Sequence, residues 1–271
     1  MCPVFFMSRI FYWTTAEALH FLVLLAIASA SGSPLSASEE WDQEQAKIMI
    51  AKVLEVEKAG GLPWNRIPWR IQTQSALQEA RATGKPLFVF FFVPQPGPPT
   101  EPCGLEGRLL RTHVLSDPKI IQMVKAECIP IKIRLEEGED YPVDWPALKH
   151  WATAFKFSNE RGFAGCSVIS PDLGIEYGNS GSARIYELLT SPAFDPEAIL
   201  RMLKRAMERV NEERAILVQR GISIEERKAE ILRFRKGVTR AVRSEGRRNL
   251  PPVGYSLKQA LELYRVAGVE A

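Results

Sequence analysis

Apolar and polar positions alternate between helical and extended patterns through the middle of the chain. Leu87 to Val93 is a continuous apolar run bounded by turn residues, which predicts a strand buried on both faces of a sheet. Further strands are predicted at Ile129 to Leu135, at Gly165 to Ser170 and, after a turn, near Ile175 to Tyr177. Helical patterns separate these strands, so the sequence predicts an α/β fold with a central sheet covered by helices.

The predicted helices carry recognisable start and stop signals. Asp195-Pro196-Glu197 opens a helix with an acidic first turn, and Ser223 with Glu226 forms a capping box. The helix predicted at 42–58 is stopped by Gly60-Gly61, and it is too apolar for a free linker, so we expect it to pack on the rest of the protein. The other helices are predicted at 75–83, 105–112, 118–126, 145–155 and 257–267.

The N-terminus has the pattern of an export signal. An apolar run at 21–28 leads into Ala28-Ser29-Ala30, a small-x-small cleavage pattern. The run is shorter than the roughly 20 residues needed to span a bilayer. A cleaved signal at 1–30 is therefore favoured over an uncleaved anchor, and the expected location is the periplasm, the cell envelope or the exterior.

Charge is concentrated near the C-terminus. The net charge of the chain is +3, but residues 201–248 hold 15 Lys/Arg against 7 Asp/Glu, a local balance of 15 − 7 = +8. The basic residues alternate with Ile, Leu, Met and Val, which favours a packed amphipathic extension with a solvated face. Contact with a membrane surface or an acidic partner stays open, whereas the export signal argues against nucleic acid.

Three segments resemble the thioredoxin superfamily. They are "SALQEARATGKPLFVFFFV" (75–93), "CGLEGRLLRTHVLSDPKIIQMVKAECIPIKI" (103–133) and "FAGCSVISPDLG" (163–174). The resemblance covers about 66–210 and implies a thioredoxin-like three-layer sandwich with a central mixed sheet. An N-terminal helix and a helical C-terminal extension would be added to it. The predicted division is a signal at 1–30, a polar linker and helix at 31–65, the thioredoxin-like domain at 66–210 and a basic helical extension at 211–271.

The chain departs from the thioredoxin pattern at the redox site. The expected C-x-x-C is Cys103-Gly104-Leu105-Glu106, so Glu106 replaces the resolving cysteine. The approach to the site, Pro94 to Pro102, is longer and richer in proline than usual. No proline fits the position of the cis-proline, which Ala164, Gly165 or Cys166 must occupy.

These departures leave two functional interpretations. A dithiol enzyme needs a resolving thiol within reach of the mixed disulfide, and Glu106 removes it. The chain is therefore expected to be a binding or structural module without disulfide reductase turnover, with an unknown protein partner in the cell envelope. The alternative is an envelope thiol-disulfide protein that uses Cys103 alone or paired with Cys166.

The Cys166 pairing is implied by the resemblance, because the cis-proline loop touches the active-site cysteine in this fold. A disulfide would require Cα atoms within about 7 Å. Cys103 would lie at a helix N-terminus, which favours a thiolate, but Glu101 and Glu106 oppose it. Cys128 is expected in the core.

No cofactor or metal is expected. His113 and His150 stand outside any metal-ligand spacing, and His113 falls near the far end of the helix that would follow Cys103. The sequence has no phosphate-binding loop of the Walker type, no G-x-G-x-x-G dinucleotide motif and no G-x-S-x-G nucleophile motif.

Overall fold

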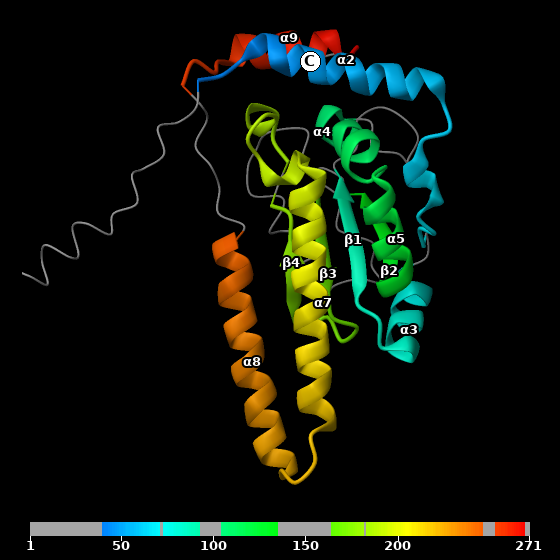
Figure 1. The fold of residues 1–271 in the computed structure, drawn as a ribbon, viewed down its shortest axis with the longest axis vertical. Helices are drawn as coiled ribbons and strands as arrows, with labels where there is room; N and C mark the ends of the chain where they lie inside the picture. Colours follow the sequence, from blue (N-terminus) through cyan, green and yellow to red (C-terminus); the bar gives the residue numbers. More distant parts are fainter. Residues whose placement is uncertain are drawn as a thin grey trace, which may run out of the picture. The chain divides into compact units, whose positions relative to one another are not determined.

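A four-stranded mixed sheet lies at the centre of the protein in the computed structural model (Figure 1). Its strands are β1 (Leu87–Phe92), β2 (Ile129–Arg134), β3 (Ala164–Ile169) and β4 (Glu176–Asn179), in the order β2-β1-β3-β4. β1 and β2 are parallel, whereas β3 is antiparallel to both β1 and β4. The predicted α/β class and central mixed sheet are confirmed.

The structure describes residues 40–70, 73–92, 104–134, 164–181, 183–245 and 253–268. The predicted export signal, the proline-rich approach, Cys103, the helix expected at 145–155 and His150 lie outside these residues. Every other predicted helix and strand falls on a described element.

β1 is buried on both faces, as its apolar run predicts. Phe88, Phe90 and Phe92 point into the larger core, and the alternate side chains point into a smaller one on the opposite face. Helix α3 (Thr73–Thr83) covers the smaller core through Ala76 and Ala80. The larger core is covered by α4 (Leu105–Leu109), α5 (Pro118–Glu127) and α7 (Pro196–Val218).

The predicted helix starts are confirmed by their side chains. Asp42 caps α2 (Gln43–Ala59) by accepting from the Gln45 N–H at 2.9 Å. At α8 (Ile224–Glu245), Ser223 Oγ accepts from the Glu226 N–H while Glu226 accepts from the Ser223 N–H. The remaining helical elements are α9 (Leu257–Val266), η1 (Pro63–Arg66), η3 (Ile185–Glu187) and η4 (Pro192–Phe194).

One predicted helix has a different ending. A continuous helix was expected at 105–112, but α4 gives way to a π-helical turn, η2 (Leu110–Val114), in which the Leu115 N–H donates to the Leu110 carbonyl at 2.7 Å. The wider turn extends the helical stretch to Val114. Widened turns of this kind leave no local pattern of apolar residues, so the sequence did not indicate it.

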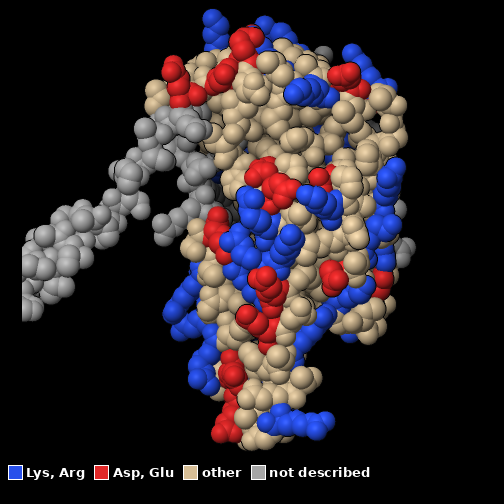
Figure 2. Space-filling view, viewed as in Figure 1, with Lys and Arg blue, Asp and Glu red and all other residues tan. Residues whose placement is uncertain are grey.

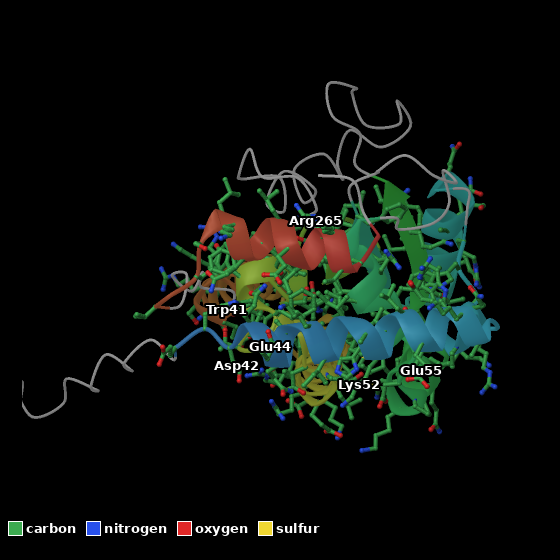
Figure 3. The ribbon with its side chains drawn as sticks, turned by 90° about the horizontal axis from the view of Figure 1, so that it is seen from above. Trp41, Asp42, Glu44, Lys52, Glu55 and Arg265 are labelled. Atoms are coloured by element: carbon green, nitrogen blue, oxygen red, sulfur yellow. The ribbon has the colours of Figure 1, made fainter. Side chains whose placement is uncertain are left out.

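The first and last described helices, α2 and α9, pack side by side (Figures 1 and 3). Gln43 Nε2 donates to the Gln259 carbonyl and to Glu262, and Lys47 Nζ lies 2.7 Å from Glu262 Oε1. We call residues 41–59 and 253–268 the α2–α9 cap. The expectation that the N-terminal helix packs on the protein is confirmed.

Residues 40–271 form one unit by their contacts, and α7 continues through the domain boundary predicted at residue 210 to Val218. Within this unit, α8 packs against α7 and β4, with Val238 and Val242 buried. Among the described residues, none of the helices combines the length and the apolar composition that crossing a bilayer requires.

Candidate functional site

Glu106, the residue in place of a second active-site cysteine, lies in the first turn of α4 and is only 2% exposed. The hydroxyl of Tyr264, on α9, donates to Glu106 Oε1 at 2.6 Å. The two residues are 158 positions apart in sequence. The C-terminal helix therefore covers Glu106.

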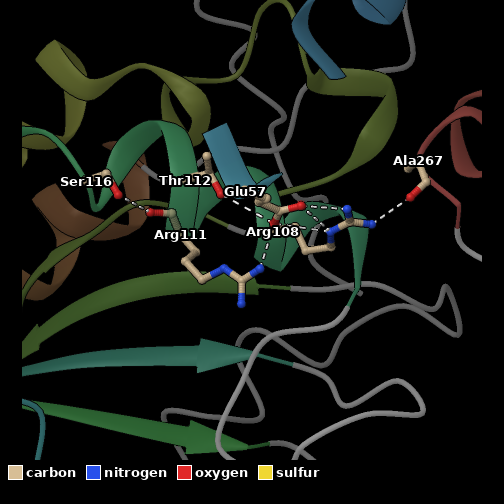
Figure 4. Close-up of polar contacts among 6 residues, drawn as sticks. All are labelled: Glu57, Arg108, Arg111, Thr112, Ser116 and Ala267. Atoms are coloured by element: carbon tan, nitrogen blue, oxygen red, sulfur yellow. Dashed lines mark hydrogen bonds and ion pairs between the residues drawn. The ribbon is translucent and has the colours of Figure 1, made fainter. Parts of the chain in front are cut away.

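A second polar cluster fixes the same region (Figure 4). Glu57, near the end of α2, accepts hydrogen bonds from Arg108 of α4 and Arg111 of η2, with N–O distances of 2.6 Å for both ion pairs. Arg108 also donates to the Ala267 carbonyl at the end of α9, at 2.7 Å. Thr112 adds a long contact of 3.5 Å to Glu57. One carboxylate thus joins the α2–α9 cap to the helix that follows the expected redox site.

These ion pairs are largely removed from water, with side chains 14–16% exposed. Burial by itself raises the pKa of Glu57, but the hydrogen bonds from Arg108 and Arg111 outweigh it and hold the pKa below its ordinary value. Glu57 is therefore a carboxylate at neutral pH, and both arginines have a charged partner.

Cys166 lies in β3, opposite Phe90 of β1, and is fully buried in the larger core. Its N–H donates to Ser180 Oγ at 2.8 Å, and its thiol is free. Burial raises the pKa of this thiol far above its ordinary value, so the thiolate is strongly disfavoured. Cys103 lies outside the described residues, and its pairing with Cys166 stays a prediction.

Ala164, Gly165 and Cys166, the three candidates for the cis-proline position, are all part of β3. Cys128 is 2% exposed, and burial raises the pKa of its thiol to about 12, which agrees with the expected core role.

His113 lies exposed on η2. Within the described ranges, no group of three or more His, Cys, Asp or Glu side chains is placed to hold a metal ion.

A third polar cluster, absent from the predicted site residues, attaches α8 to the sheet. Glu213 of α7 is 3% exposed and accepts from the Tyr177 hydroxyl of β4 and from Arg235 of α8. Arg235 also reaches Asp172 in the β3–β4 turn at 2.8 Å. The partners come from four separate segments, so no local spacing in the sequence indicates the cluster.

Glu176 in β4 is another titratable group that the sequence did not single out. It accepts hydrogen bonds from the Ser167 hydroxyl and from Asn179. Burial raises the pKa of its carboxyl to about 7, against the smaller opposing effect of these hydrogen bonds. Both of these partners are neutral side chains, so neither exchanges a proton with Glu176 near neutral pH.

A shallow groove of about 420 Å³ runs beside α5, lined by Arg66, Pro118, Ile121, Gln122, Lys125 and Ala126. None of the predicted site residues lines it. It therefore adds no ligand site to the region of Glu106.

The comparisons with known proteins leave the family open. No protein-family model matches the chain, and no curated protein matches it. Among solved structures, the chain is similar to a DsbH oxidoreductase, with a TM-score of 0.35 and 13% sequence identity over 52% of this chain and 85% of that one. A likeness this weak identifies neither a family nor an activity for this protein.

Proposed function

We propose that this protein is an exported thioredoxin-like module that lacks disulfide reductase turnover and serves a binding or structural role in the cell envelope. The thioredoxin-like part of the proposal rests on the three resembling segments. The parallel β1–β2 pair with its helical crossover, followed by the antiparallel β3–β4 pair, is compatible with it.

The contact between Glu106 and Tyr264 carries the functional part. A resolving thiol must reach the mixed disulfide, but the residue at this position is 2% exposed and hydrogen-bonded to α9. The position is used to dock the C-terminal helix.

The buried state of Cys166 gives further support. A thiol that is fully buried, free and raised in pKa is a poor partner for exchange with an external disulfide. It matches a small core residue better than a redox pair.

A turnover assay tests the proposal. The full chain is supplied with excess dithiol, and its reduction of insulin and of a chromogenic disulfide is compared with that of Cys103→Ser. Cys2→Ser is the matched control for loss of one thiol outside the site. We expect all three proteins to turn over at the uncatalysed rate. Turnover that Cys103→Ser abolishes and Cys2→Ser preserves would establish the thiol-disulfide alternative instead.

A further inference from the structure

The far half of the α7–α8 hairpin, residues 214–237, contains no buried residue. The last buried residue of α7 is Glu213, and the first of α8 is Val238. We call residues 214–237 the hairpin tip. It holds eight Ile, Leu, Val or Phe residues, of which Phe234 packs against the larger core, and Arg235 near its base reaches Glu213 and Asp172.

The lengths of the elements explain why the tip stands clear of the core. α7 has 23 residues and is about 34 Å long at 1.5 Å per residue. The longest described strands have six residues and span about 20 Å. Figure 1 shows the turn between α7 and α8 projecting past the ends of the strands.

Large apolar side chains are exposed on this projection. Leu217 is 50% exposed, Val218 75%, Ile224 67% and Leu232 69%. Single exposed apolar residues are normal on protein surfaces, and four within 16 residues of one projecting hairpin form a candidate contact surface. The stretch 253–266 exposes as many, so the charge of the tip must distinguish it.

The net charge of the hairpin tip indicates the kind of surface that it contacts. It carries seven Lys/Arg and three Glu, a balance of 7 − 3 = +4. Arg220 and Lys228 are exposed at the turn end, and Lys228 pairs with the well-exposed Glu225. Figure 2 shows basic side chains gathered over the α7 and α8 face, with acidic ones among them. A tip-to-tip contact with a second copy would bring like charges together, whereas an anionic surface is complementary to the tip.

We propose that the hairpin tip docks on the surface of an anionic lipid membrane. Leu217, Val218 and Ile224 enter the boundary between headgroups and acyl chains, while the neighbouring Arg and Lys stems extend their charged ends to the lipid phosphates. A convex, projecting apolar end suits a deformable bilayer better than a protein pocket. The inference goes beyond the proposed function and does not depend on it, because the tip shares no residue with the region of Glu106.

A fluorophore placed at the tip tests this proposal without interference from the apolar N-terminal segment. In the full chain carrying Cys2→Ser and Cys103→Ser, an environment-sensitive dye is attached through Val218→Cys. A matched protein carries the dye through Glu55→Cys, exposed on α2. Cys128 and Cys166 are buried and stay unlabelled in the folded protein.

Vesicles of phosphatidylcholine alone and with phosphatidylglycerol are then added. We expect the emission maximum of the dye at Val218→Cys to shift to shorter wavelength with the anionic vesicles only, and high salt to reverse this shift. The emission maximum of the dye at Glu55→Cys should not change. Arg220→Glu with Lys228→Glu changes the tip balance from +4 to 4 − 4 = 0. This pair should raise the lipid concentration for half-maximal change by roughly tenfold or more, given about fivefold per basic residue near an anionic surface.

The control pair Lys58→Glu with Lys125→Glu makes the same change in net charge away from the tip and should shift that concentration by less than about twofold. Leu217→Ser with Ile224→Ser removes apolar side chains and keeps the charge, and should also weaken the response. Circular dichroism confirms that each variant is folded. The proposal is overturned if the emission of the dye at Val218→Cys is unchanged with anionic vesicles, or if neutral vesicles shift it equally. The same emission shift with polyglutamate would also overturn it and would identify an acidic polypeptide as the partner.

Discussion

The α2–α9 cap and the hairpin tip are both helical additions to the sheet and both expose apolar side chains, yet only the cap also contributes buried residues to the core. In the cap, Leu263 is fully buried, and Glu57 and Glu106 are held between helices by Arg108, Arg111 and Tyr264. In the tip, apolar side chains stand in solvent beside exposed basic ones.

The comparison shows that an added helix can either pack into the core or present an exposed surface. The polar groups that fasten the cap have buried partners, and Ala46, Ile50 and Leu263 belong to the larger core, but the cap also exposes Ile48, Val56, Val253, Leu257, Leu261 and Val266. The tip contributes no buried residue and contacts the rest of the protein near its base, through Phe234 and Arg235. The cap therefore covers Glu106 and the start of α4, whereas the turn end of the tip is exposed.

The largest expected difference comes from one substitution made in both regions. Leu263→Ala leaves a cavity in the cap and should lower the free energy of unfolding by about 2–4 kcal/mol. Leu217→Ala removes an exposed side chain and should change it by less than about 0.5 kcal/mol. Urea denaturation measures both. Equal losses would remove the distinction between cap and tip.

Glu57 provides the next test. Glu57→Gln takes away the charge that both arginines share, and should cost about 2 kcal/mol of unfolding free energy because the pairs are mostly buried. Glu44→Gln breaks an exposed pair with Lys47 on the same helix and should cost less than about 0.5 kcal/mol. If Glu44→Gln were the more damaging of the two, the Glu57 cluster would not be what fastens the cap.

The pH dependence of the same carboxylate should follow from its lowered pKa. A carboxyl group whose pKa is lower in the folded state stabilises fully above its ordinary value, here 4.5, and loses that contribution as the pH falls through the folded value. The stability difference between the wild type and Glu57→Gln should therefore be constant from pH 6 to 8 and shrink as the pH falls below 4.5. Urea titrations across this range measure it, and a difference that grows on acidification would contradict the sign.

Local sequence patterns predicted the elements well. Asp42, Asp195 and the Ser223–Glu226 pair mark helix starts that the structure shows, and the run from Leu87 is the buried central strand. Apolar periodicity and end-capping act over a few residues, so one segment contains the whole signal.

The candidate site could be predicted only in part. Glu106 was recognised as a departure, but its partner Tyr264 lies 158 positions away, and Arg108 and Arg111 lie 51 and 54 positions from Glu57. Side-chain pairs between distant segments depend on how the helices dock, and leave no local spacing. The thioredoxin-like assignment and the role of Cys103 accordingly stay predictions.

Amide hydrogen exchange of α9, in the wild type and in Tyr264→Phe, tests most directly whether the C-terminal helix covers Glu106. We predict that the wild-type helix is protected well beyond a free peptide. Tyr264→Phe should speed its exchange by roughly tenfold, as expected for about 1.4 kcal/mol lost with one buried hydrogen bond, while α8 is unchanged. Exchange of wild-type α9 at the rate of an unstructured peptide would contradict the account.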